Sequence, residues 1–327
     1  MDSPRDILRT VKAAKRILIP LHLRPDGDSI GSALACYHFF RDLNKTVTVV
    51  SADPVPDIFF FLPGAKKIRV VDPSTLPLER FDLVFLTDNA DSSRFSRAGK
   101  IEIPPKVILI NVDHHQSNPG FGDLNYVVAD ASSTAEILYD LFRLWKAPLT
   151  SEVANCLLTG IYTDTGGFLY PATTADSFVK SADLMRKGAN RARIAEQSFR
   201  SWTPKAIPIW SQILANTIIR KNVAYSQLSH AELRKLNCSQ SELAGIRGFA
   251  VNNLILAIRD VKAAILFTEE KPRQVRVTLR SVGNVDIGKV AEKFGGGGHL
   301  NAAAFDYQGP IKKLAAKTVR LVRETFN

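Results

Sequence analysis

Residues 81–90, FDLVFLTDNA, contain an unbroken apolar run that ends in an aspartate, Asp88. Two other stretches have the same form, RILIPLH at 16–22 and KVILINVDHH at 106–115. A fourth, TVTVVS at 46–51, is rich in the β-branched residues that favour strands. Strands that are continuously apolar, rather than alternating, are typical of a parallel sheet covered on both faces.

Helical patterns fall between and after these strands. The first covers about residues 30–43. The segment 132–145 contains Ser133 with Glu136 three residues later, which is the pattern of a helix capping box. Two more helices are expected at about 152–162 and 175–187. This alternation predicts an α/β fold whose first domain is a doubly wound, mostly parallel sheet.

The second half of the chain has a different pattern. Strands are expected at 263–268 and 274–280, and helices at about 286–294 and 311–325. Between the two halves, Gly188, Pro204 and Pro208 interrupt helix-like stretches of sequence. We therefore expect a first domain over residues 1–187, a connector over 188–212, and a smaller mixed α/β domain over 213–327.

The composition fits two globular domains. The 327 residues are 45 % hydrophobic and 23 % charged, which excludes a disordered or coiled-coil chain. No apolar run approaches the ~20 residues of a membrane-spanning helix, and the first ten residues do not form a secretory signal. The three cysteines are too few for a disulfide framework. We expect a cytoplasmic protein with reduced thiols and no membrane partner.

The net charge of +11 is unevenly distributed. Residues 1–190 hold 21 Lys and Arg against 22 Asp and Glu, whereas residues 191–327 hold 22 against 10. A basic second half favours an anionic partner, most often a nucleic acid or a nucleotide. A basic surface that maintains solubility explains the charge equally well.

Acidic and imidazole side chains follow the predicted strands. In an open parallel sheet, ligands bind outside the carboxyl ends of the strands, so these groups should meet in one crevice. Asp164 follows a predicted helix, and its place is less closely determined. The groups at the strand ends are His22, Asp26, Asp28, Asp88, Asp113, His114 and His115.

Each of these groups also has an ordinary structural explanation. Asp26 and Asp28 could belong to a turn with a helix cap, and a lone His22 is usually a hydrogen-bonded core residue. The triplet Asp113-His114-His115 is harder to explain, because three titratable groups after a buried strand are costly to desolvate without a shared partner. A bound cation would remove the repulsion among the acids. Oxygen and imidazole donors favour Mn²⁺ or Mg²⁺, although Co²⁺, Fe²⁺ or Zn²⁺ also fit.

A glycine run lies in the basic half. Gly295–Gly298 is followed by His299, and it matches neither a P-loop nor a dinucleotide fingerprint. Successive glycines let backbone N–H groups surround an anion, although four glycines alone also suit a hinge. The adjoining histidine and the basic surroundings favour phosphate binding.

These motifs, in this order, resemble the DHH/DHHA1 phosphoesterase family. The first domain is similar to DHH and the second to DHHA1, over about residues 15–320. The short chain without added domains is similar to the family's NrnA type, which comprises oligoribonucleases that also act as pAp phosphatases. The resemblance rests on His22, Asp26, Asp28, Asp88, the 113–115 triplet, Asp164 and the 295–299 run.

The resemblance implies two divalent metal ions, with Mn²⁺ expected ahead of Mg²⁺ or Co²⁺. It assigns His22, Asp26 and Asp88 to the first ion. It assigns Asp28, Asp88, His114 and Asp164 to the second, so that Asp88 bridges. The catalytic residues would be Asp88, Asp113 and His115, with Asp113 orienting a neighbouring histidine. The substrate phosphate would contact His115, Arg280, Ser281, Gly296, Gly297, Gly298 and His299.

The implied reaction is hydrolysis of short 5′-phosphorylated oligonucleotides to mononucleotides by a hydroxide that the two ions activate. Dephosphorylation of pAp and a possible homodimer also follow from the resemblance. A phosphodiesterase of linear or cyclic dinucleotides (pApA, pGpG, cyclic di-AMP) is the alternative. A manganese inorganic pyrophosphatase and a non-catalytic nucleic-acid-binding module are further alternatives.

Overall fold

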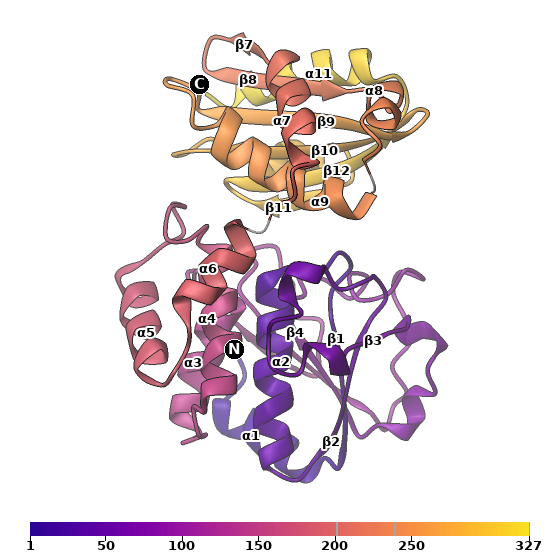
Figure 1. Cartoon of the computed structure of the whole chain (residues 1–327). Coiled ribbons are helices and arrows are strands. Elements are labelled where there is room, and N and C mark those ends of the chain that lie inside the picture. The colour runs from indigo at the N-terminus through magenta and orange to yellow at the C-terminus, as the bar shows by residue number, and fades with distance from the viewer. Residues whose placement is uncertain (201, 239, 327) are drawn as a thin grey trace. The chain divides into compact units, whose positions relative to one another are not determined.

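The computed structural model describes residues 1–200, 202–238 and 240–326, with the backbone only at 240–242, 244 and 299. The chain divides into two compact units, Met1–Ser201 and Trp202–Asn327, which contain the indigo-to-magenta and the orange-to-yellow elements of Figure 1. The expected connector is shared between them. Helix α6 (Arg191–Phe199) belongs to the first unit, and α7 (Ala206–Ala215) belongs to the second.

The first unit is built on a six-stranded sheet in the order β3-β2-β1-β4-β5-β6, and every described pairing is parallel. This confirms the predicted doubly wound fold. The strand order reverses between β1 and β4, the adjacent strands from which the chain winds in both directions. Its strands are β1 (Arg16–Pro20), β2 (Thr46–Ser51), β3 (Arg69–Val70), β4 (Leu83–Thr87), β5 (Ile108–Asp113) and β6 (Leu124–Val127). Its helices are α1 (Pro4–Ala13), α2 (Gly27–Asp42), α3 (Thr134–Leu144), α4 (Ser151–Asp164), α5 (Ala175–Arg186) and α6.

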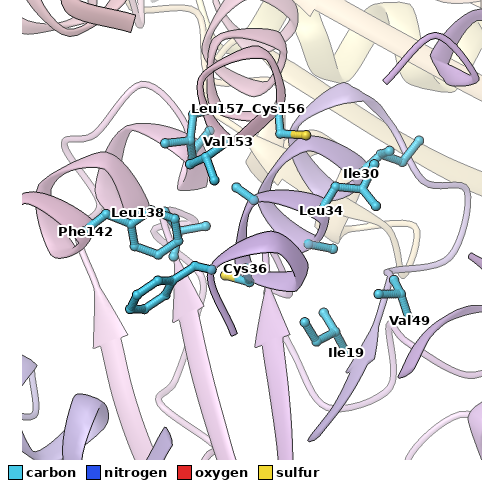
Figure 2. Close-up of a cluster of buried hydrophobic side chains, with 14 of the residues drawn as sticks. Ile19, Ile30, Leu34, Cys36, Val49, Leu138, Phe142, Val153, Cys156 and Leu157 are labelled. Carbon is cyan, nitrogen blue, oxygen red and sulfur yellow. The ribbon is translucent and has the colours of Figure 1, made fainter. Parts of the chain in front are cut away.

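Helices α2 and α3 pack against this sheet, and α4 packs on these two helices. Figure 2 shows Ile30 and Leu34 of α2 and Leu157 of α4 within this hydrophobic core, and all three are fully buried. Cys36 and Cys156 lie in the same cluster and are fully buried. Such a core excludes water beneath the carboxyl ends of the strands and holds the helices at fixed positions.

Two glycines allow α2 and α4 to approach closely. A Cβ atom at Gly31 would lie 2.4 Å from the backbone oxygen of Cys156, and one at Gly160 would lie 2.5 Å from Asp28 Oδ1. No larger residue fits either position without separating the helices. This contact determines where Asp164, the last residue of α4, lies relative to α2.

The second unit contains a mixed six-stranded sheet in the order β11-β12-β10-β9-β8-β7. Only β8 and β9 pair in parallel, and the other described pairs are antiparallel. Its strands are β7 (Ile218–Arg220), β8 (Val223–Leu228), β9 (Ala263–Lys271), β10 (Gln274–Ser281), β11 (Gly297–His299) and β12 (Ala302–Gln308). Its α-helices are α7, α8 (His230–Lys235), α9 (Gln240–Phe249), α10 (Gly288–Glu292) and α11 (Ile311–Glu324), and a π-helix, η5 (Ala250–Ile255), follows α9.

Some element boundaries differ from the sequence predictions. Helix α10 is shorter than the expected 286–294, and Asp164 lies within α4 rather than after it. Strands β3, β6, β7, β8, β11 and β12 were not predicted, and three of them (β3, β7 and β11) have only two or three residues, too few to show a periodicity. Within the described residues, no helix combines the length and the hydrophobicity needed to cross a bilayer.

Candidate metal centre

The carboxyl ends of β1, β4 and β5 bring the predicted ligands together. His22 follows β1, Asp88 follows β4, and His114 follows β5. These strands are neighbours, so their ends meet where the strand order reverses, which is the binding position expected of a doubly wound sheet. Asp28, in the first turn of α2, and Asp164, at the end of α4, lie beside them.

The first group consists of His22, Asp26 and Asp88. His22 Nε2 lies 3.2 Å from Asp88 Oδ2 and 3.6 Å from Asp26 Oδ1. The other ring nitrogen, Nδ1, is 2.8 Å from the Leu23 carbonyl oxygen, so a proton on Nδ1 leaves the Nε2 lone pair facing the carboxylates. Asp26 also accepts hydrogen bonds from the backbone N–H groups of Asp28 and Ser29. It is therefore the expected helix cap and a member of this group at once.

The second group consists of Asp28, His114 and Asp164, whose ligand atoms all lie within 4.8 Å of one another. His114 Nε2 is 3.3 Å from Asp164 Oδ2 and 3.5 Å from Asp88 Oδ1. Its Nδ1 is 3.3 Å from the Ala131 carbonyl oxygen. Because Asp88 approaches His22 with one oxygen and His114 with the other, it connects the two groups.

Asp88 has an unusual backbone conformation. Its φ is 61°, which is rare for a residue other than glycine. The Asp88 N–H donates to the Val112 carbonyl oxygen at 3.0 Å, so the sheet continues to hold the backbone at this point. Backbone strain of this kind persists where the surrounding structure enforces it, and it concentrates at functional sites.

Asp113 and His115 form a separate pair beside the two groups. His115 Nδ1 lies 2.8 Å from Asp113 Oδ1, and Asn118 donates to the other carboxylate oxygen at 2.6 Å. Asp113 is fully buried. His115 Nδ1 is also 3.6 Å from Asp88 Oδ1, the oxygen that approaches His114, and the ligand atoms of Asp88, His114 and His115 lie within 4.8 Å of one another. The role of Asp113 in orienting a histidine stays a prediction, and the contact with His115 is the one that this role requires.

The start of α3 also contributes to the site, which the sequence reasoning did not predict. Asp28 accepts hydrogen bonds from the backbone N–H groups of Thr134 at 2.6 Å and Ala135 at 2.9 Å. The Thr134 hydroxyl donates to Asp88 Oδ1 at 3.4 Å. A helix N-terminus presents unpaired N–H groups and a partial positive charge, so it stabilises a buried carboxylate. The capping pattern at Ser133 was the available signal, but it does not reveal what the helix start faces.

The charges of the site are strongly coupled. Burial opposes the protonation of His22, but Asp26 and Asp88 outweigh it and raise the pKa of His22 to about 10. Burial and the nearby Asp88 raise the pKa of Asp28 to about 7. Burial also raises the pKa of Asp164 well above its usual range, against the opposing effect of His114. Protons therefore occupy sites where a cation would relieve the same repulsion.

The donor set fits divalent cations. Two ligand atoms that share one ion at ~2.1 Å lie about 3.0–3.5 Å apart in octahedral or tetrahedral geometry. The distances from His22 and His114 to their carboxylates span 3.2–3.6 Å, which is close to that range. Carboxylate and imidazole donors without cysteine suit Mn²⁺ and similar ions. The members of the two groups are all among the predicted ligands, and their binding of metal ions stays a prediction.

The predicted phosphate-binding residues lie in the second unit. Arg280 of β10 pairs with Ala302 of β12, which in turn pairs with His299 of β11. These three residues form one row across three strands. The Arg280 guanidinium donates to the Leu279 carbonyl oxygen at 2.8 Å. The side chain of His299 lies outside the described part of the chain, so its predicted contact is placed by the backbone alone.

The glycine run forms an edge strand rather than a loop that surrounds an anion. The Gly296 N–H donates to the Ala291 carbonyl oxygen, and Gly297 and Gly298 pair with β12. A Cβ atom at Gly298, whose φ is 147°, would lie 2.3 Å from the Ala302 carbonyl oxygen. Close packing on β12 therefore explains part of this run, and the outer edge of β11 leaves alternate N–H groups unpaired by the sheet.

Ser281 is buried, and its hydroxyl has partners in the loop after β10 and in the turn between β11 and β12. Its hydroxyl donates to the Val285 carbonyl oxygen at 2.7 Å and accepts from Asn301 at 2.8 Å. As the neighbour of Arg280 on a strand, it faces the opposite side of the sheet. This arrangement gives Ser281 a structural role and separates it from the Arg280 row.

Comparisons with known proteins agree with this architecture. The DHH family N-terminal domain matches residues 16–161, and the DHHA1 domain matches residues 220–324. The chain is 32 % identical to the bifunctional oligoribonuclease and PAP phosphatase NrnA of Thermus thermophilus, over 98 % of this chain and 92 % of the relative. It is 28 % identical to the protein of the same name from Bacillus subtilis, over 90 % of each chain.

A solved structure shows the same fold. An exopolyphosphatase-related protein from Bacteroides fragilis superposes with a TM-score of 0.88 and 27 % identity, covering 99 % of this chain and 96 % of that one. The chain belongs to the DHH/DHHA1 phosphoesterase family. Three relatives that are 28–32 % identical over at least 90 % of the chain are named as NrnA proteins, one of them as a probable one, which confirms the expected type and the expected class of enzyme.

Proposed function

We propose that the chain is a two-metal phosphodiesterase that hydrolyses short 5′-phosphorylated oligonucleotides to mononucleotides and also dephosphorylates pAp. The observation that carries the proposal is the convergence of two ligand groups on Asp88, in a chain similar over 98 % of its length to an oligoribonuclease and PAP phosphatase. Mn²⁺ is the expected ion, followed by Mg²⁺ and Co²⁺.

His22, Asp26 and Asp88 would hold one ion, and Asp28, Asp88, His114 and Asp164 would hold the other. When bound, two divalent ions activate a water for in-line attack at phosphorus and stabilise the attacking and leaving oxygens. The chain contributes preformed ligand geometry. Asp28 and His114 are held by backbone groups near the start of α3, so little reorganisation is needed when the ions enter.

His115 is the proposed contact to the scissile phosphate. Asp113 fixes the ring through Nδ1, so Nε2 is the atom with which His115 would reach a phosphate oxygen. The hydrogen bond from Asn118 holds the Asp113 carboxylate itself in place. Loss of Asp113 would therefore misorient His115 without removing a metal ligand.

Arg280 and the β11 edge are proposed to bind the terminal phosphate of the substrate. A guanidinium binds a phosphate in a bidentate manner, and Arg280 lies in the same strand row as His299. The second unit holds 19 Lys and Arg against 9 Asp and Glu over residues 202–327, which favours an anionic ligand. A clamp on a chain end favours short substrates.

The test is Mn²⁺-dependent release of mononucleotide from 5′-phosphorylated RNA of two to about twenty nucleotides, with pAp, cyclic di-AMP and pyrophosphate assayed in parallel. The proposal predicts the highest kcat/KM on the dimer, a steep fall with length, and hydrolysis of pAp. Hydrolysis of pyrophosphate alone would overturn it. Equal degradation of long strands would indicate that the substrate binds in an open groove and that no clamp holds its terminal phosphate.

A further inference from the structure

One short segment contacts three of the proposed metal-binding residues. The Ala131 carbonyl oxygen faces His114 Nδ1 at 3.3 Å, and the Thr134 and Ala135 N–H groups donate to Asp28. The Thr134 hydroxyl reaches Asp88. Residues 131–135, which we call the α3 entry segment, therefore determine how these ligands point.

The hydrogen bonds to Asp28 leave room for one more partner. Its Oδ1 accepts from the Ser32 hydroxyl at 3.2 Å and from Ala135 N–H, whereas Oδ2 accepts from Thr134 N–H. Each carboxylate oxygen has two lone-pair sites, so one site on Oδ2 remains unused by these three bonds. The position of the two N–H groups decides where that remaining lone pair is directed.

Glu136 holds the α3 entry segment in place. Its carboxylate accepts from the Ser132 N–H at 3.2 Å and also from the Ser132 hydroxyl. It accepts further hydrogen bonds from Ser177 at 3.0 Å and Lys180 at 3.1 Å, both on α5. The Glu136 residue is only 3 % exposed.

This arrangement departs from the capping box that the sequence predicted. The Ser133 hydroxyl accepts from the Glu136 N–H at 3.1 Å, as expected of a helix cap. The carboxylate instead bonds to Ser132, one residue earlier, and to α5. A capping box would stabilise the helix end alone, whereas this network connects the α3 entry segment to another helix.

We infer that Glu136 is a positioning residue for the second ion, acting through the α3 entry segment on Asp28 and His114. The inference rests on the proposed function, because it takes Asp28 and His114 as ligands. Outer-sphere groups that orient ligands typically change metal affinity by 10- to 100-fold. Asp26, a ligand of the first ion, is held instead by the α2 N–H groups, so the first ion should be affected less.

The test compares Glu136→Ala with Glu232→Ala. Glu232 is a matched control in the second unit, where it accepts from Ser229 N–H at 2.8 Å, the Ser229 hydroxyl at 2.6 Å and Asn216 at 2.9 Å. Both variants lose a multiply bonded carboxylate at the start of a helix. Mn²⁺ titration by calorimetry and electron paramagnetic resonance measures the affinity for each ion. Amide hydrogen exchange of the metal-free proteins measures how well the N–H groups of Thr134 and Ala135 are protected.

For Glu136→Ala, we expect the affinity for the second ion to fall by about 10- to 100-fold and the affinity for the first to change by less than about threefold. The amide hydrogens of Thr134 and Ala135 should exchange faster. Glu232→Ala should change the affinity for neither ion, even if it lowers the melting temperature of the protein. If Glu136→Ala does not fold, Ser177→Ala is the second variant. It removes one hydrogen-bond donor to Glu136 and should lower the affinity for the second ion by a smaller factor.

Unchanged binding of both ions, or unchanged exchange at Thr134 and Ala135, would overturn the inference. Failure of the wild-type protein to bind Mn²⁺ would overturn the proposed function and this inference together. The two failures are thus distinguished by the wild-type titration.

Discussion

The two units place their predicted functional residues by different physical rules. In the first unit, His22, Asp88 and His114 span 92 positions of the sequence, and they lie together because the parallel strands that precede them end at one edge of the sheet. In the second unit, Arg280 and His299 share a row because of antiparallel register across three strands. The first rule can be applied to a sequence directly, whereas register depends on turns and bulges that a sequence shows poorly.

The largest expected effect is the loss of activity on substitution of Asp88, the residue that connects the two ligand groups of the first unit. Asp88→Asn removes a charge from both ligand groups, so kcat/KM on a 5′-phosphorylated dinucleotide should fall by at least about 10³-fold. The far-ultraviolet circular dichroism of the variant should match that of the wild type. Retention of a tenth of the activity by a folded Asp88→Asn protein would contradict the bridging role.

A second substitution tests the Arg280 row of the second unit. Arg280→Ala should raise KM for the dinucleotide by about 10- to 100-fold with a smaller change in kcat, because the proposed charge-assisted bond to phosphate would be lost. Steady-state kinetics measure this split. Arg276→Ala is the matched control four residues along the same strand, where the guanidinium pairs with Asp306 at 3.0 Å, and its KM should change by less than about threefold. Equal effects of the two variants would indicate a general charge effect instead of a clamp.

Protons should compete with metal ions for the ligand residues of the first unit. The pKa of His22 is raised to about 10 and that of Asp28 to about 7, so the metal-free site holds protons near neutral pH. Ion binding must release them, and Mn²⁺ affinity should therefore increase as pH rises from 6 to 8. A tenfold rise or more is expected from calorimetry in buffers of different ionisation enthalpy. A pH-independent affinity with no proton release would contradict the assignment of these residues as ligands.

A smaller perturbation tests the packing behind the crevice. Gly160→Ala would place a Cβ atom 2.5 Å from Asp28 Oδ1 and from Ala135 Cβ. We expect roughly 1–3 kcal/mol of destabilisation and about a tenfold loss of kcat/KM, because overpacking displaces Asp28. Gly248→Ala is the control, since nothing lies within 4 Å of its Cβ position on α9, and it should be neutral or stabilising by up to ~1 kcal/mol. Urea unfolding and dinucleotide kinetics check both variants, and equal stability of the two would contradict the packing argument.

The smallest effect concerns Ser281. Because its hydroxyl is committed to Val285 and Asn301, Ser281→Ala should cost about 1 kcal/mol of unfolding free energy and leave KM within about twofold of the wild type. Thermal unfolding and steady-state kinetics measure the two quantities. A tenfold rise in KM would restore Ser281 to the phosphate site that the family resemblance implies.

The comparison also shows how far the sequence could be interpreted. Continuous apolar runs predicted β1, β4 and β5, and β-branched residues predicted β2. The acids and imidazoles that follow β1, β4 and β5 include every member of the two ligand groups except Asp164, which ends α4. The roles of Thr134 and Glu136 could not be predicted, because a capping pattern identifies a helix start but not the residues it faces. Strand β11 was missed because glycines carry no side-chain periodicity.

The central claim is that two ions share Asp88 in the first unit, and a crystal structure grown with Mn²⁺ tests it most directly. Anomalous scattering at the manganese edge should show two peaks about 3.5–4 Å apart, with the Asp88 carboxylate between them and His22 and His114 on opposite ions. A single peak, or two peaks that do not share Asp88, would contradict the account.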